Sequence, residues 1–370
     1  MKMTEQITVI PFDTIRNCEQ GEVPGPRVLS LTAEERTLVT FALFAYNQDK
    51  YIREAVEGAF TQTYEPLEII LSDDCSTDRT FEIMKEMASA YKGTKKIVIR
   101  QTHSNMGTFL HVADVASIAA GELIVVAHGD DISKKERTKE IVNEWLSTRA
   151  WGIYSKFDRI NENGKIFSES EDPRKLFSPE YLSNFLSNTQ ANAEIVYGPV
   201  SAYDKRIFNF LEVKKTDYIL SEDGVLSVLL NMLGKEIKMI NKSLVSYREN
   251  EQSITNSAKD RKISFKIMES DEFKIERFAR SHANRCELFI RWNNKFGMEN
   301  QQLNTKKILG DLVKHRMREK WRLTELSEKL IYLKDNFSYA EIKWALPRIL
   351  PMPIFFLIKA FIRKIIRRSR

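Results

Sequence analysis

Between Thr37 and Ala127 the chain alternates short runs of β-forming apolar residues with segments in which apolar residues recur every three or four positions. Short apolar runs bounded by polar residues predict buried strands, and the longer spacing predicts amphipathic helices. Strands that alternate with helices are typical of a mostly parallel sheet flanked by helices, so the sequence predicts an α/β fold. The expected strands are Thr37–Phe44, Leu67–Leu71, Ile97–Ile99 and Leu123–Ala127.

Helical spacing follows each expected strand. The second of these helices should begin near Ser76–Asp78, because all three residues are good helix caps. After the last strand, Ser133 and Glu136 have the spacing of a capping box. From Arg261 to Leu333 apolar positions keep a helical period among many charges, which predicts a helical C-terminal region. The apolar positions of the first three helices lie within 52–60, 81–91 and 109–116.

Polar residues gather directly after these strands. In a mostly parallel sheet the carboxyl ends of the strands meet at one edge, and ligands bind outside that edge. Four separate loops therefore converge on one predicted site. They are Tyr46-Asn47 with Ala45 before them, Asp73-Asp74, Asn105 to Gly107, and Asp130-Asp131.

Two of these clusters are pairs of adjacent carboxylates. Burying Asp73-Asp74 costs free energy unless donors or a cation meet them, which indicates a ligand rich in hydroxyl or base groups. The hard oxygens of Asp130-Asp131 suit Mg²⁺ or Mn²⁺, whose shell is normally completed by phosphates and water. The alternatives are a helix start for the first pair and an ordinary turn for the second. We expect His128 to be a hydrogen-bonding loop residue.

Composition narrows the class of protein. The chain has 370 residues, and 42% of them are hydrophobic, which is enough for a packed core. Its three cysteines, Cys18, Cys75 and Cys286, are far apart in sequence, which favours a reducing compartment and argues against structural zinc. Residues 1–15 contain no apolar leader, so we expect a cytoplasmic protein.

The basic charge is concentrated at one end of the chain. The net charge is +6, and six basic residues with no acid lie in the last twelve positions. Such a localised tail fits anionic lipid headgroups better than nucleic acid. Placed on a helix, 350–370 separates an apolar from a basic face, and its apolar stretch Ile354–Ile358 is too short to span a bilayer, which predicts peripheral association with the inner face of the cell membrane. The alternative is docking on another subunit or on the domain itself.

Taken in order, the motifs from Thr37 to about Thr255 resemble the family 2 glycosyltransferases. The resemblance implies a GT-A fold, which is Rossmann-like, and an inverting, metal-dependent enzyme of the polysaccharide, O-antigen or capsule type. The motifs are Phe44-Ala45-Tyr46-Asn47, Asp73-Asp74-Cys75-Ser76-Thr77-Asp78, Asn105-Met106-Gly107, Gly129-Asp130-Asp131, Ser221-Glu222-Asp223 and Tyr247-Arg248.

The resemblance also implies roles for these residues. Tyr46, Asp73 and Asn105 would hold the nucleoside of a nucleotide-diphosphate sugar, with a UDP- or dTDP-sugar the expected donor. Asp130 would face the ribose or the sugar, Asp131 would bind Mn²⁺ or Mg²⁺, and Arg248 would lie near the phosphates. In the Glu222-Asp223 pair Asp223 would be the general base. The matching loops add Ala45, Asn47, Asp74 and Gly107 to the predicted donor site.

The chain departs from the family pattern at three positions. Cys75 stands where a glycine is usual, His128 where many members carry another Asp, and Asn250 where a His often follows Tyr-Arg. The expected acceptor is a glycan or a lipid-linked glycan. The rival interpretations are a non-catalytic protein that binds nucleotide-sugar or glycan on the same fold, and a nucleotidyltransferase. The sequence assigns no oligomeric state.

The expected organisation has four parts. Residues 1–36 form an N-terminal extension, and 37–258 form the GT-A domain. The helical region spans 259–336, and the basic amphipathic tail spans 337–370.

Overall fold

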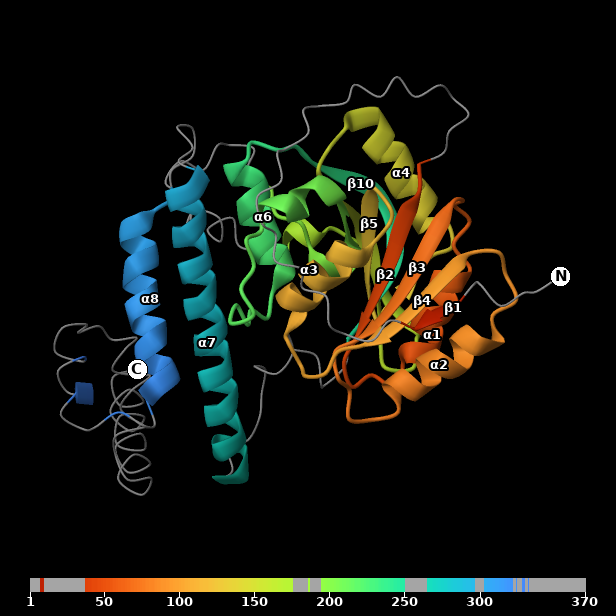
Figure 1. Ribbon diagram of the computed structural model, residues 1–370. Helices are drawn as coiled ribbons and strands as arrows, with labels where there is room; N and C mark the ends of the chain where they lie inside the picture. Colours follow the sequence, from red (N-terminus) through yellow and green to blue (C-terminus); the bar gives the residue numbers. More distant parts are fainter. Residues whose placement is uncertain are drawn as a thin grey trace, which may run out of the picture.

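The structure is a computed structural model. In its described part a ten-stranded sheet is flanked by helices (Figure 1). The predicted α/β fold with its mostly parallel sheet is therefore confirmed. The expected tail 337–370, Asn250 and nearly all of the N-terminal extension lie outside the described residues. Described are residues 7–9, 37–175, 186, 194–249, 265–296, 303–321, 324, 328, 329 and 332.

One half of the sheet is parallel. Its strand order is β1-β4-β3-β2-β5, so β2 has β3 on one side and β5 on the other. The chain order reverses on either side of β2, and such a switch point is where α/β sheets bind ligands. The bounds are β1 Ile7–Val9, β2 Val39–Ala45, β3 Leu67–Asp73, β4 Lys96–Gln101 and β5 Leu123–His128.

The other half of the sheet is mixed. β9 pairs antiparallel with β5 and β7, and β10 runs parallel to β7. The short strand β6 pairs antiparallel with β10, and β8 pairs with β7. The bounds are β6 Ile132–Ser133, β7 Gly152–Ile160, β8 Ile166–Glu171, β9 Ser201–Asp204 and β10 Ile237–Arg248.

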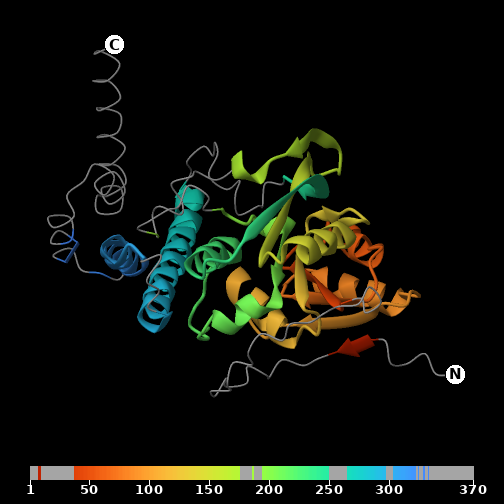
Figure 2. The same ribbon diagram turned by 90° about the horizontal axis from the view of Figure 1, so that it is seen from above.

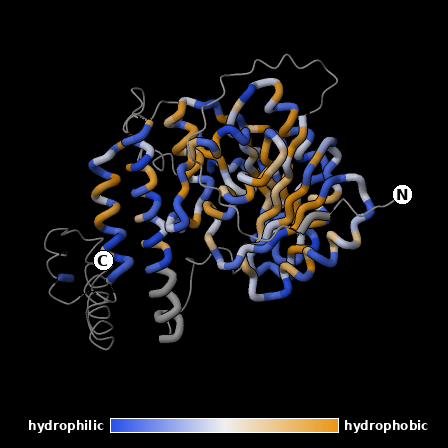
Figure 3. The backbone as a smooth tube through the Cα atoms, viewed as in Figure 1, coloured by the Kyte–Doolittle hydropathy of each residue, from blue (hydrophilic) through white to orange (hydrophobic). Residues whose placement is uncertain are grey.

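Helices bury one core on each face of the sheet. α1, α2 and α4 cover one face with residues such as Ile52, Met84 and Trp145, and α3 and α6 cover the other with residues such as Phe109 and Leu226. Hydrophobic positions accordingly concentrate on the central strands (Figure 3). The helices are α1 Ile52–Phe60, α2 Thr80–Ala90, α3 Thr108–Ile118, α4 Arg137–Thr148 and α6 Glu222–Met232, with 3₁₀ turns at Pro173–Lys175, Gly198–Val200 and Lys205–Phe210.

One expected helix start lies close to the observed one, and the other is wrong. α2 begins at Thr80, two residues after Asp78, whose Oδ1 accepts the Thr80 N–H over 2.9 Å, whereas Ser76 belongs to the preceding turn. The expected capping box does not form. Ser133 lies in β6, pairs with Val245 of β10 and accepts a hydrogen bond from Arg137.

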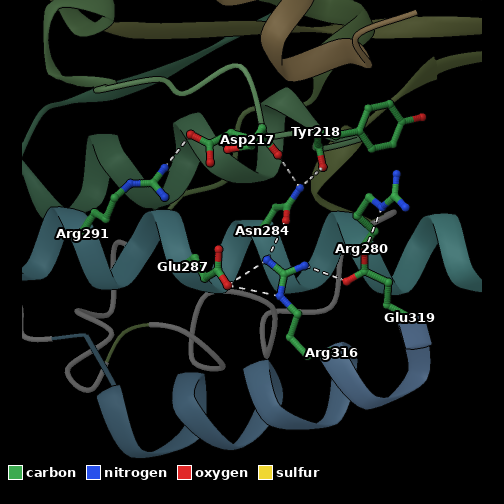
Figure 4. A network of polar contacts seen from close by, with 9 residues as sticks. Asp217, Tyr218, Arg280, Asn284, Glu287, Arg291, Arg316 and Glu319 are labelled. Carbon is green, nitrogen blue, oxygen red and sulfur yellow. Dashed lines mark hydrogen bonds and ion pairs between the residues drawn. The ribbon is translucent and has the colours of Figure 1, made fainter. Parts of the chain in front are cut away.

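The predicted helical C-terminal region is confirmed by α7 (Phe265–Phe296) and α8 (Thr305–Lys320). These two helices pack together on the α6 side of the sheet (Figure 2). Asn284 of α7 donates to the main chain at Thr216 and Tyr218, and accepts from Arg316 of α8 (Figure 4). The α7–α8 pair thus holds the segment that leads into α6.

Candidate active site

The loop after β2 is fastened to the turn after β3. Asn47 has a left-handed backbone with φ of 54°. Its N–H donates to Ser76 Oγ over 2.8 Å, and its side-chain oxygen accepts the Thr77 N–H over 2.8 Å. Ala45 is buried, whereas the neighbouring Tyr46 is 39% exposed, so the ring of Tyr46 presents a face to solvent. An exposed aromatic face beside the switch point suits stacking against a planar base.

Asp73 and Asp74 are buried at the end of β3, and protein donors occupy both carboxylates. Asp73 accepts from Ser76 and from Gln101. Asp74 accepts the N–H groups of Met106 and Gly107 over 3.0 and 3.1 Å, and so anchors the next predicted loop. Burial raises the pKa of Asp74, and these hydrogen bonds oppose that rise. The pair therefore shapes the site in addition to any contact with a ligand.

The loop after β4 packs closely on the segment before α6. Gly107 has φ of 79°, and a Cβ there would lie 3.0 Å from the Tyr218 ring and 3.2 Å from the Ile219 carbonyl oxygen. Only glycine accommodates both constraints without strain. The side chain of Asn105 reaches back to the Asp74 carbonyl oxygen at 3.5 Å. Asn105 therefore lies beside the loop that follows β3, as the sheet topology predicts.

Cys75 adopts φ of 61°, a backbone conformation that favours glycine. This explains why the family pattern usually has glycine at this position. Its thiol contacts the His103 carbonyl oxygen at 3.5 Å, which ties the turn after β3 to the loop after β4.

Asp131 is buried and has one oxygen available. Its Oδ1 accepts the N–H of Arg248 over 2.8 Å, whereas its Oδ2 has no hydrogen-bond partner. Burial and the neighbouring Asp130 raise the pKa of Asp131 to about 8. Gly129 allows this loop to pass close to the end of β2, because a Cβ there would lie 2.4 Å from the side chain of Gln48 and 3.0 Å from the Cβ of Ala45.

Arg248 is fully buried beneath the Asp130-Asp131 loop. Its guanidinium donates to the carbonyl oxygens of Asp130 and Glu162 over 2.9 Å, and pairs with Glu54 at 2.9 Å. These contacts, with the N–H bonded to Asp131, make Arg248 a support for the loop. The position near the phosphates that the family pattern implies stays a prediction.

The predicted acidic pair Glu222-Asp223 opens α6. Asp223 accepts from the Ser221 hydroxyl over 2.6 Å, from Gly224 N–H over 2.7 Å, and from Gly198 N–H over 3.2 Å. Burial, followed by the charge of Glu222, raises the pKa of Asp223. A raised pKa brings a carboxylate closer to the range in which it accepts a proton efficiently.

His128 links the two acidic pairs of the site, Asp130-Asp131 and Glu222-Asp223. It ends β5, and its Nε2 lies 3.5 Å from Oε1 of Glu222. Burial alone would lower the pKa of His128, but Glu222, Asp131 and Asp130 raise it to about 9. The expectation of an ordinary hydrogen-bonding loop residue missed this ion pair, because no local pattern relates two residues so distant in the chain.

The structure therefore brings the predicted residues to one edge of the sheet. Ala45 is in register with Asp73, and Phe44 with His128, so the ends of β3, β2 and β5 lie side by side. Through Glu222, His128 connects this edge to the start of α6. Sequence reasoning also missed Gly198, whose backbone N–H contacts Asp223 and which carries no recognisable motif.

Comparison with known proteins agrees with this geometry. Residues 40–211 match the model of the family described as Glycosyl transferase family 2. This part of the chain therefore belongs to glycosyl transferase family 2.

Curated relatives extend the match beyond that domain. The glycosyltransferase GlyG of Streptococcus pneumoniae serotype 4 is 27% identical over 245 residues, which cover 64% of this chain and 79% of that protein. An uncharacterized protein of Mycobacterium tuberculosis strain H37Rv is 30% identical over 223 residues, which cover 58% of this chain. The chain spans 59% of the length of this mycobacterial relative.

A solved structure shares the fold. The crystal structure of GalNAc-T7 with UDP, GalNAc and Mn²⁺ superimposes with a TM-score of 0.50 at 14% identity. The superposition covers 77% of this chain and 58% of that chain. The predicted GT-A fold is confirmed.

Proposed function

We propose that this chain is an inverting glycosyltransferase that moves a sugar from a nucleotide-diphosphate sugar to a hydroxyl of a glycan or a lipid-linked glycan. The observation that carries the proposal is the buried Oδ2 of Asp131, which has no hydrogen-bond partner and lies at the sheet edge beside the ion pair of His128 and Glu222. Leaving such an atom unpaired costs about 1–3 kcal/mol, so it indicates a place built for a polar ligand.

The donor is held on the β2 side of the site. Tyr46 stacks on the base, and Asp73 and Asn105 border the nucleoside. Asp130 faces the ribose or the sugar. This assignment is supported by the exposure of the Tyr46 ring and by the position of β2 at the switch point of the sheet. A UDP- or dTDP-sugar remains the expected donor.

Asp131 is the residue that we propose to bind Mn²⁺ or Mg²⁺. In the described part of the chain no three His, Cys, Asp or Glu side chains form a ready-made cation site. The buried, unpartnered Oδ2 of Asp131 nevertheless fits a cation that takes its other ligands from a diphosphate and water. The related fold of GalNAc-T7 was solved with Mn²⁺. Such a cation supplies charge neutralisation for the leaving diphosphate.

Asp223 accepts the proton of the acceptor hydroxyl. Its Oδ2 is held by the Gly198 N–H at 3.2 Å, and its Oδ1 is held at the first turn of α6. These bonds fix the direction of the carboxylate, and its raised pKa suits a general base. One base and one direct displacement invert the configuration of the anomeric carbon.

We also propose that the enzyme works on the inner face of the cell membrane, on which the tail rests. Within the described residues, every helix is too short or too polar to cross a bilayer. Removing 350–370 should move the protein from the membrane fraction to the soluble fraction at low salt, because headgroup attraction is electrostatic. Unchanged fractionation would exclude the anchor.

The test of the activity is the variant Asp223→Asn in a transfer assay, with Glu236→Gln, an exposed carboxylate, as the matched control. We expect Asp223→Asn to lower kcat by about 10²–10⁴-fold while nucleotide binding stays nearly unchanged, since general-base catalysis is worth about that much. The control should keep full activity.

Full activity of Asp223→Asn would remove Asp223 from the mechanism. A wild-type protein that binds nucleotide-sugar but neither transfers nor hydrolyses it would support the rival, a non-catalytic binding protein on the same fold.

A further inference from the structure

Arg137, the first residue of α4, is fully buried below the site with a relative exposure of 0%. Its Nη1 donates to Ser133 Oγ over 2.9 Å. Its Nη2 donates to the carbonyl oxygens of Val126, Pro199 and Ser201 over 2.7, 3.2 and 3.3 Å. These hydrogen bonds all end on a hydroxyl or on main-chain carbonyl oxygens.

A buried guanidinium that is bound only by a hydroxyl and carbonyl oxygens adds little to the free energy of unfolding. Removing its charge from water costs several kcal/mol, and a carboxylate partner would normally compensate. Burial lowers the pKa of Arg137 to about 9, and Asp131 opposes that shift, so the side chain carries its charge at neutral pH. Because burying the charged guanidinium of Arg137 costs free energy, we expect this residue to have a role beyond packing.

The carbonyl oxygens that Arg137 contacts belong to two segments that border the site, β5 and residues 199–201. Val126 lies in β5, the strand that leads to the Asp130-Asp131 loop. Pro199 and Ser201 belong to the segment that follows Gly198, the residue whose N–H holds Asp223.

The backbone at Gly198 has no room for a side chain. A Cβ on Gly198 would lie 2.5 Å from Oε1 of Glu222 and 3.5 Å from Oδ2 of Asp223. A small shift of the 198–201 segment therefore changes the surroundings of both acidic residues at the start of α6.

We propose that Arg137 is a positioning residue: it holds the 198–201 segment against β5, and so keeps Asp223 aligned with the donor bound at Asp131. This inference rests on the proposed function. Arg137 itself lies behind the main chain and touches no reacting atom.

A merely structural arginine would affect folding stability and leave the chemical step of the folded fraction unchanged. A positioning residue affects kcat in protein that is still folded and still binds its donor. Measuring kcat and nucleotide affinity separately, in protein that is still folded, therefore distinguishes the two roles.

The experiment compares Arg137→Lys and Arg137→Met with Lys139→Met, an exposed residue of the same helix, all assayed well below their melting temperatures. Lysine keeps the charge but cannot span the same carbonyl oxygens. We expect both Arg137 variants to lower kcat by about a hundredfold, the effect of misplacing a catalytic group by about 1 Å. The dissociation constant for the nucleoside diphosphate should stay within about threefold, and Lys139→Met should behave as wild type.

If the Arg137 variants do not fold, the variant Ser133→Ala tests the inference instead. It removes the hydroxyl that accepts a hydrogen bond from Nη1 of Arg137 and leaves the arginine in place. It should lower kcat in the same direction by a smaller factor. An unchanged kcat in folded Arg137→Lys, or in Ser133→Ala, would overturn the inference. Absence of transfer by the wild type would instead count against the proposed function, so the two failures are distinguishable.

Discussion

The Nε2 atom of His128 lies 3.5 Å from Oε1 of Glu222, so the end of β5 and the first turn of α6 meet through side chains of opposite charge. Glu222 is 3% exposed, and its carboxylate lies beside Asp223. His128 therefore supplies positive charge at a position where the family pattern often has another Asp.

This ion pair predicts energetic coupling. His128→Gln should lower the free energy of unfolding by about 1–3 kcal/mol at pH 7, because Glu222 is left buried without its cation. The double variant His128→Gln/Glu222→Gln should lose less than the sum of the single variants, by about 1 kcal/mol or more. Urea unfolding of the four proteins measures the coupling. Strict additivity would show that the pair contributes nothing as a pair.

Cys75 predicts a stabilising substitution. Its φ of 61° is strained for any residue with a Cβ, so Cys75→Gly should raise the free energy of unfolding by about 0.5–1 kcal/mol. Cys75→Ala is the control, because it removes the thiol and keeps the strain. Equal unfolding midpoints for the two variants would show that the backbone conformation is not the cause.

His111 predicts a pH dependence of stability. Its ring is buried, with Nε2 2.6 Å from Ser72 Oγ. Burial first, and then the charge of Arg100, lowers the pKa of His111 to about 3. Below its ordinary pKa of about 6.5 the unfolded chain takes up a proton that the folded chain does not, so stability is lost as the pH falls from 6.5 towards 3.

The contribution of His111 should amount to about 2 kcal/mol between pH 7.5 and pH 5. His111→Gln cannot titrate, so its unfolding free energy should fall less steeply over this range than that of the wild type. Parallel pH profiles for the two proteins would contradict the assignment.

Much of the fold follows from local pattern. The runs at Leu67–Leu71 and Leu123–Ala127 became β3 and β5 because buried parallel strands need continuous apolar residues. β1, at Ile7–Val9, was not predicted, because a β-branched run of three residues is too short to indicate a strand by itself, and its pairing with β4 is a long-range contact. Ser133 failed as a helix cap for the same reason, since β10 recruits it into β6.

The candidate site was predicted at the level of loops, not of contacts. Strand ends place Asp73 and Asp131 at one edge of the sheet, which the order of the sequence already implies. The sequence does not reveal that Arg248 is buried beneath the Asp131 loop or that His128 meets Glu222. These relations depend on residues about a hundred positions apart, which only the folded chain brings together.

The central claim is that the sheet edge around Asp131 binds a nucleoside diphosphate with a divalent cation. The most direct measurement is the melting temperature with UDP, dTDP, GDP or CDP, each with and without Mn²⁺, for wild type and Asp131→Asn. We predict that at least one nucleotide raises the wild-type melting temperature only with Mn²⁺, and that Asp131→Asn abolishes the rise. No rise with any nucleotide, or an equal rise in Asp131→Asn, would contradict the claim.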